Sequence, residues 1–101
     1  MARLTPAARK NLILKAAVDF ARREGWTYLT RDAVAAEAEC AEGLVNHYFG
    51  DFTNLRDDVM RYAVRSGLLA LIAEGLEEEN DVAEHAPEVI KERARVWKCY
   101  Q

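Results

Sequence analysis

The stretch TRDAVAAEAECAEGLVNHYF, residues 30–49, decides the fold of this chain. Thr30 is a suitable N-cap, because its hydroxyl can accept a hydrogen bond from a free backbone N–H of the first helical turn. Apolar residues then recur at helical spacing, with a break at Glu39. The stretch predicts two short helices, over residues 31–38 and about 42–48, joined by a tight turn. Their inward-facing residues are Val34, Ala35, Ala38, Val45, Tyr48 and Phe49.

Helices of about two turns bury too little surface to be stable alone, so these two need a third helix to pack against. Residues 6–24 supply it, with Thr5 as N-cap, Pro6 in the first helical position and Gly25 as the stop. Its apolar stripe consists of Leu12, Ile13, Ala16, Ala17 and Phe20. Three helices in this order predict a helix-turn-helix, a unit that places its last helix in the major groove of DNA.

The segment resembles the N-terminal DNA-binding domain of the TetR family of transcriptional repressors over roughly residues 8–65. The resemblance implies an all-α fold and a homodimeric repressor that binds a palindromic operator in double-stranded DNA. The residues that match in register are Ile13, Leu14, Ala16, Ala17, Gly25, Thr30, Val34, Ala35, Ala38, Gly43, Val45, Tyr48, Phe49 and Leu55.

Several positions depart from the family pattern, among them Phe20-Ala21, where the family has Leu-Phe. Glu39 stands where the family has a turn Gly, Ala41 replaces Ser, Asn46 replaces Tyr and Phe52 replaces Lys. The last three changes remove contacts to phosphate, which lowers non-specific affinity. They indicate a surface adapted either to an unusual operator or to a partner other than DNA.

The predicted recognition helix turns polar and small residues outward. Asn46 could read adenine, Glu42 could accept a hydrogen bond from cytosine N4, and Leu44 could touch a thymine methyl. His47 either contacts a phosphate or is an ordinary surface residue, and Arg31 either binds a phosphate at a helix N-terminus or is simply exposed. The predicted DNA-binding residues are Thr30, Arg31, Ala41, Glu42, Gly43, Leu44, Asn46, His47 and Tyr48.

The charge of the chain is unevenly distributed. Residues 1–31 carry seven Lys or Arg against two acids, a net +5, whereas residues 32–101 carry seven basic against fifteen acidic residues, a net −8. A basic front end is compatible with DNA binding, and equally with a solvated face of an ordinary helix. The seven cations are Arg3, Arg9, Lys10, Lys15, Arg22, Arg23 and Arg31.

The sequence divides into a helix-turn-helix domain, residues 1–50, and a part for core completion and dimerisation, residues 51–101. The second part predicts a long fourth helix from Phe52 to about Glu74, an acidic loop over residues 77–84 and a short C-terminal helix over residues 88–99. The last part of the fourth helix, from Leu68 to Leu76, is apolar nearly all round, so we expect it to pack on the C-terminal segment, on a second subunit or on both. The predicted dimer interface consists of Leu68, Leu69, Ile72, Leu76, Val96, Trp97 and Tyr100.

Other classes of function have little support in the sequence. There is no catalytic motif and no metal-ligand spacing, so we expect no enzyme, cofactor or metal site. No segment is apolar enough for a signal peptide or a membrane span, so we expect a cytoplasmic protein with Cys40 and Cys99 as free thiols. The residues after the fourth helix are too few to enclose a small-molecule ligand. The alternative to a repressor is a protein–protein interaction module with this fold, such as an antirepressor.

Overall fold

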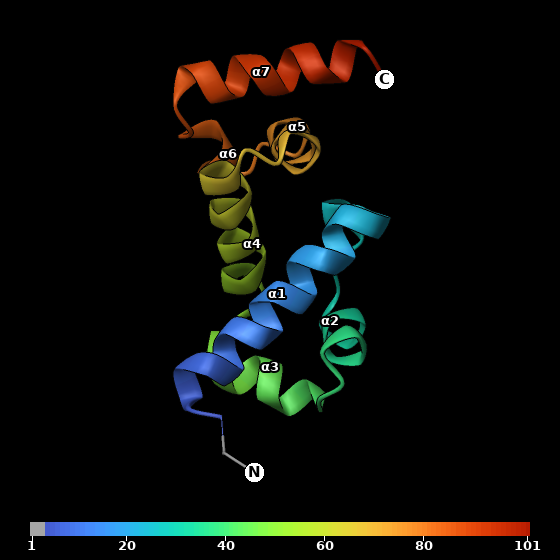
Figure 1. Ribbon diagram of the computed structural model, residues 1–101, viewed down its shortest axis with the longest axis vertical. Helices are drawn as coiled ribbons and strands as arrows, with labels where there is room; N and C mark the ends of the chain where they lie inside the picture. Colours follow the sequence, from blue (N-terminus) through green and yellow to red (C-terminus); the bar gives the residue numbers. More distant parts are fainter. Residues whose placement is uncertain (1–3) are drawn as a thin grey trace.

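The computed structural model describes residues 4–101, and within them the fold is all-α, as predicted (Figure 1). The molecule is elongated, 46 × 24 × 21 Å. α2, α3 and the start of α4 lie toward one end, and α7 runs across the other end (Figure 1). Arg3 lies outside the described residues. The elements are α1 (Pro6–Glu24), the 3₁₀ turn η1 (Trp26–Tyr28), α2 (Arg31–Ala38), α3 (Glu42–Phe49), α4 (Phe52–Ser66), α5 (Leu69–Glu77), α6 (Asp81–Glu84) and α7 (Glu88–Cys99).

Local capping signals set the helix boundaries. The Thr5 hydroxyl accepts a hydrogen bond from the Ala8 N–H at 3.1 Å, and Gly25, at φ 116°, ends α1. Asp51 accepts from the Thr53 N–H at 3.1 Å and starts α4. The predicted boundaries of α1, α2 and α7 are confirmed. For α1 and α2 the reason is that their side-chain caps depend on residues close in sequence.

The predicted helix from Phe52 to Glu74 is wrong, because the chain turns between α4 and α5. Gly67 adopts a left-handed conformation, with φ 68° and ψ 36°, and its N–H donates to the Ala63 carbonyl. The Leu68 N–H donates to the same carbonyl at 2.9 Å. Glycine adopts this conformation without the steric cost of a side chain, so Gly67 is the signal for the break.

The predicted loop over residues 77–84 is also wrong, because its last part is the short helix α6. The Asn80 side chain caps that helix by accepting a hydrogen bond from the Ala83 N–H at 3.1 Å. Its amide also donates to Asp57 on α4 at 2.9 Å. Asn80 therefore both starts α6 and ties it to α4.

The buried apolar residues form one core that runs from α1 to α7. At the end of the molecule that contains α3, four helices each contribute at least one residue to this core. Among these residues are Ile13, Val34, Val45 and Leu55, each at most 2 % exposed. Leu12, predicted to face this core, is instead 52 % exposed. The residues of this core are Ile13, Ala17, Val18, Ala21, Trp26, Leu29, Val34, Ala35, Val45, Phe49, Leu55, Val59, Met60, Ala63, Leu71, Ile72, Ala73, Ala83 and Ala94.

Trp26 joins the first three helices to α4 and α5. Its indole N–H donates to the Arg56 carbonyl at 3.2 Å, and its backbone N–H donates to the Glu74 carboxylate at 3.1 Å. The Arg56 guanidinium lies 4.1 Å from the indole centroid and forms an ion pair with Glu78 at 3.7 Å. Trp26 is only 2 % exposed, and its contacts with Arg56 and Glu74 connect the first three helices to α4 and α5.

The predicted dimer interface is partly wrong. Ile72 is fully buried in the core of a single chain, because the turn at Gly67 directs one side of α5 against α4. α7 packs on α5, the part of the chain that was predicted as the apolar end of the fourth helix. Val96 and Tyr100 stay exposed, and the remaining members are half-buried against the core: Leu68, Leu69, Leu76 and Trp97.

Candidate nucleic-acid interface

The outward face of α3 is polar and small. Ala41, Glu42, Gly43, Asn46 and His47 are exposed, and we call these five residues the reading face. Within the helix, residues four apart lie on the same side, so Glu42 is next to Asn46 and Gly43 is next to His47. A Cβ placed on Gly43 would meet no atom within 4 Å, so the space in front of it is open.

Two predicted DNA-binding residues of α3 face the protein instead. Leu44 and Tyr48 are half-buried and pack against the core. The Tyr48 ring also contacts the His47 ring edge to face, at 4.9 Å between centroids. Their contribution is therefore to hold α3 in place, and any base contact falls to the reading face.

The turn between α2 and α3 contains Glu39, one of the residues that depart from the family pattern. Glu39 is left-handed, with φ 55° and ψ 45°, and the Cys40 N–H beyond it donates to the Ala35 carbonyl at 2.9 Å. A side chain at such a position costs energy, because its Cβ approaches the following carbonyl oxygen. The turn therefore has the left-handed backbone that glycine favours, although residue 39 is a glutamate.

Replacing Glu39 by Gly should raise the free energy of unfolding by about 0.5–1 kcal/mol, because the left-handed strain disappears. Urea denaturation measures the change. Ala36→Gly, on the exposed side of the same helix, is the control and should lower the free energy by about 0.5–1 kcal/mol. Equal losses in both variants would show that the Glu39 backbone is not strained.

The N-terminus of α2 carries a negative charge that sequence reasoning missed. The Thr30 hydroxyl accepts a hydrogen bond from the Ala33 N–H at 3.3 Å. It also donates to the Asp32 carboxylate, which with the backbone N–H groups of Asp32 and Ala33 lowers the pKa of that carboxyl. Asp32 is therefore ionised at neutral pH beside the predicted phosphate site. Asp32 was visible in the sequence as an acid in the first helical turn.

Asp32→Asn should raise the affinity for any DNA duplex on the order of threefold, because it removes a repelling charge next to the backbone contact. It should also lower the free energy of unfolding slightly, since an acid in the first turn stabilises a helix. Fluorescence anisotropy with a labelled duplex measures the affinity. Asp81→Asn removes the same charge from the first turn of α6 and should leave the affinity unchanged. A gain with both variants would point to net charge alone.

Two cations lie near the C-terminal end of α3, each against an aromatic ring. The Arg31 guanidinium is 5.9 Å from the centroid of Phe52, and the Lys10 ammonium is 5.1 Å from that of Phe49. Phe52 thus replaces a cation of the family pattern but holds another cation in position.

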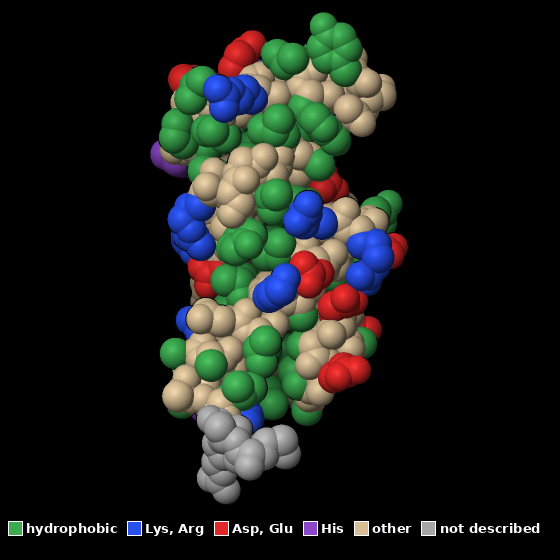
Figure 2. Space-filling model, in the orientation of Figure 1, with side chains coloured by type: hydrophobic (Ala, Val, Ile, Leu, Met, Phe, Trp, Pro, Cys, Tyr) green, Lys and Arg blue, Asp and Glu red, His purple; other side chains and the backbone are tan. Residues whose placement is uncertain are grey.

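Two other cations of α1, Lys15 and Arg23, are engaged in ion pairs. Arg23, at the far end of α1, is paired with Glu24 and with Glu37 of α2, and this pairing lowers the pKa of Glu37. Lys15 is paired with Asp19 at 3.6 Å. Figure 2 shows Lys and Arg mixed with Asp and Glu over the visible face, so no continuous basic field covers it. The predicted basic front end is therefore not a continuous basic patch on this face.

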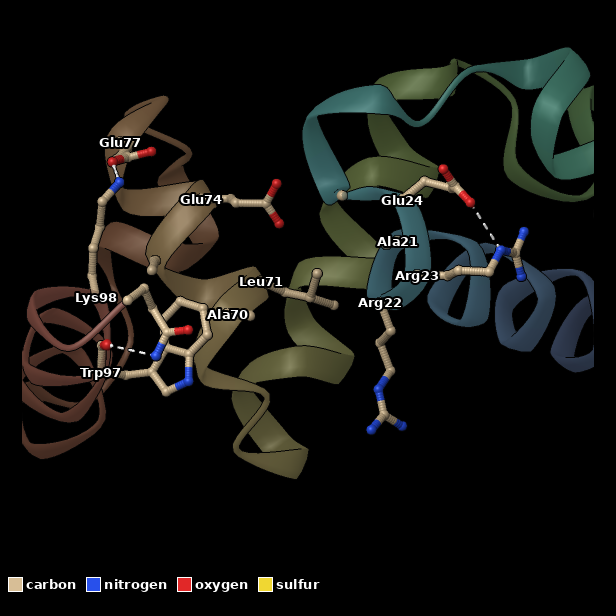
Figure 3. Close-up of a pocket in the computed structure, with 13 residues that line it drawn as sticks. Ala21, Arg22, Arg23, Glu24, Ala70, Leu71, Glu74, Glu77, Trp97 and Lys98 are labelled. Atoms are coloured by element: carbon tan, nitrogen blue, oxygen red, sulfur yellow. Dashed lines mark hydrogen bonds and ion pairs between the residues drawn. The ribbon is translucent and has the colours of Figure 1, made fainter.

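A separate groove of about 470 Å³ lies between the end of α1, α5 and α7 (Figure 3). Arg22 and Glu74 extend from opposite helices, and Trp97 covers one end (Figure 3). Lys98 pairs with Glu77 at its rim. The groove is on the opposite part of the molecule from the reading face, and it shares no residue with it.

Within residues 4–101 no group of three His, Cys, Asp or Glu side chains is arranged to hold a metal ion. None of the helices described there is long and apolar enough to cross a membrane. Comparisons with known protein families, with curated proteins and with solved structures give no match to this chain. A function for it must therefore be argued from its own residues.

Proposed function

We propose that this protein binds double-stranded DNA through α3 and regulates transcription. The observation that carries the proposal is the reading face, an exposed helical surface whose first turn has a glycine with open space in front of it. A recognition helix contacts base edges with residues of its N-terminal half, and a glycine there allows close approach to the duplex.

The surroundings of α3 support this function. Arg31 at the start of α2 and Lys10 on α1 are exposed and can contact the sugar-phosphate backbone, which positions a recognition helix. Asn46 offers an amide that can pair with adenine, and Glu42 offers an acceptor for cytosine. With few cations, the affinity should depend more on base contacts than is usual for a DNA-binding protein.

Anisotropy titration of the protein with duplexes from its neighbouring DNA, at low and at moderate salt, tests the proposal. We expect saturable binding that weakens as salt rises. Asn46→Ala should reduce the preference for one sequence, at a cost of about 1–3 kcal/mol on that sequence only, whereas Arg31→Ala should weaken all sequences alike. If both variants bind DNA as tightly and as selectively as the unmodified chain, DNA does not contact this face.

A second candidate function is a protein–protein interaction module, such as an antirepressor, with the same fold. Glu42 favours it, because among residues 4–101 its carboxylate forms no ion pair and would face phosphate in a DNA complex. Asp32 adds a second negative charge at the neighbouring helix. Absence of DNA binding even at low salt would favour this module over the regulator.

A further inference from the structure

The reading face contains no arginine or lysine. From Asp32 to Leu55 the chain has neither residue type, and two cations near α3, Lys10 and Arg31, lie over aromatic rings near its C-terminal end. Arginine and lysine make the commonest specific contact to a base, a pair of hydrogen bonds to O6 and N7 of guanine. The outward side of α3 therefore has no cation with which to read guanine.

Glu42 and Asn46 supply the hydrogen-bonding groups on one side of the reading face. Both are exposed, and within the described residues neither the carboxylate nor the side-chain amide forms a hydrogen bond or an ion pair. Being four residues apart, they lie side by side, about 6 Å apart along the helix axis. His47 is beside Gly43 instead, and its ring contacts that of Tyr48.

A carboxylate next to an amide is suited to one kind of group on a base, the exocyclic amino group. In the major groove cytosine N4 and adenine N6 are hydrogen-bond donors, whereas guanine and thymine present only acceptors there. A carboxylate therefore favours cytosine, because the N7 acceptor beside the amino group of adenine repels its second oxygen. An amide has both a donor and an acceptor, and so matches N6 and N7 of adenine.

We infer that Glu42 and Asn46 read the amino groups of a cytosine and an adenine, and that the protein thereby distinguishes unmodified DNA from DNA methylated on these groups. The inference rests on the proposed function, because it names the chemical feature that the reading face recognises. Successive bases are about 3.4 Å apart. Two side chains about 6 Å apart therefore read base pairs that are adjacent or separated by one.

Methylation of an amino group removes the donor that the protein would contact. In N6-methyladenine and N4-methylcytosine the nitrogen keeps a single hydrogen, which the Watson–Crick pair requires. The methyl group then occupies the position of the hydrogen that points into the major groove. The side-chain oxygen of Asn46 or Glu42 consequently loses its hydrogen bond and meets a methyl group.

Anisotropy titration with methylated and unmodified duplexes tests the inference. A binding site is first selected from a pool of random duplexes with the full chain, and is then synthesised with N6-methyladenine at its preferred adenine. We expect the methyl group to lower the affinity at least about tenfold. N4-methylcytosine at the preferred cytosine should give a similar loss. The control is the same methyl group on an adenine outside the selected positions, which should leave the affinity unchanged.

Two variants connect each amino group with its side chain. Asn46→Ala should bind the N6-methylated and the unmodified site equally, because it has no amide left to lose its partner. Glu42→Gln should prefer adenine where the unmodified chain prefers cytosine, since a glutamine amide matches N6 and N7. Both residues are exposed, so circular dichroism should show the same helical fold in both variants. A methyl effect that persists in Asn46→Ala would contradict the role of Asn46.

These measurements separate the inference from the proposed function. Saturable DNA binding that is indifferent to amino methylation, or a selected site without a preferred cytosine and adenine, would overturn the inference and retain the regulator. Absence of saturable binding at low salt would refute the regulator, and the inference with it.

Discussion

Trp26→Ala should lower the free energy of unfolding by about 3–5 kcal/mol, the largest loss expected for any single residue of this chain. The change removes a side chain that is 2 % exposed and leaves a cavity between α1, α4 and α5. It also removes the indole N–H that donates to the Arg56 carbonyl and the aromatic ring against which the Arg56 guanidinium lies. Since a domain of this size is stable by about 5–15 kcal/mol, the loss is a large fraction of the total.

Chemical denaturation followed by circular dichroism measures this effect. Tyr28→Ala is the matched control, because Tyr28 belongs to the same 3₁₀ turn and is 67 % exposed. Its loss should stay within about 0.5 kcal/mol. Similar losses for both aromatic residues would mean that Trp26 does not join the two ends of the molecule.

Gly43→Val should weaken DNA binding at least about tenfold while changing the free energy of unfolding by less than about 1 kcal/mol. The fold tolerates the side chain, because no protein atom lies within 4 Å of a Cβ built there. A duplex close to the helix backbone would instead collide with the branched side chain.

Gly43→Ala gives an intermediate step and should bind DNA between the parent chain and Gly43→Val. Anisotropy titration and thermal unfolding of the three proteins measure the two quantities side by side. If affinity stays constant across the series, DNA does not approach the helix at Gly43.

The sequence predicted those parts of the fold that depend on near neighbours. Thr5, Thr30 and Asp51 cap helices from within three residues, so their positions could be read directly. The break at Gly67 was missed because apolar residues continue on both sides of it and imitate one helix. The local signal in the sequence was the glycine itself, which can adopt the left-handed backbone found there.

Properties that depend on tertiary packing could not be predicted. Ile72 and Val96 have similar apolar side chains, yet one is fully buried and the other 47 % exposed, because α5 turns one side toward α4. The distribution of charge along the chain did not predict where the cations lie in space. Arg23, for example, is at the C-terminal end of α1 and pairs with Glu37 of α2. On α3, the pattern identified the exposed residues and placed Tyr48 inward, but it did not show that Leu44 also turns inward.

The most direct test of the DNA interface is a map of backbone amide chemical shifts in the full chain as a duplex is added. The proposed function predicts the largest changes at Gly43, Asn46 and His47, with smaller ones at Thr30 and Arg31, and little change in α6. Shifts confined to α5 and α7, or no shifts at low salt, would contradict the claim that α3 binds DNA.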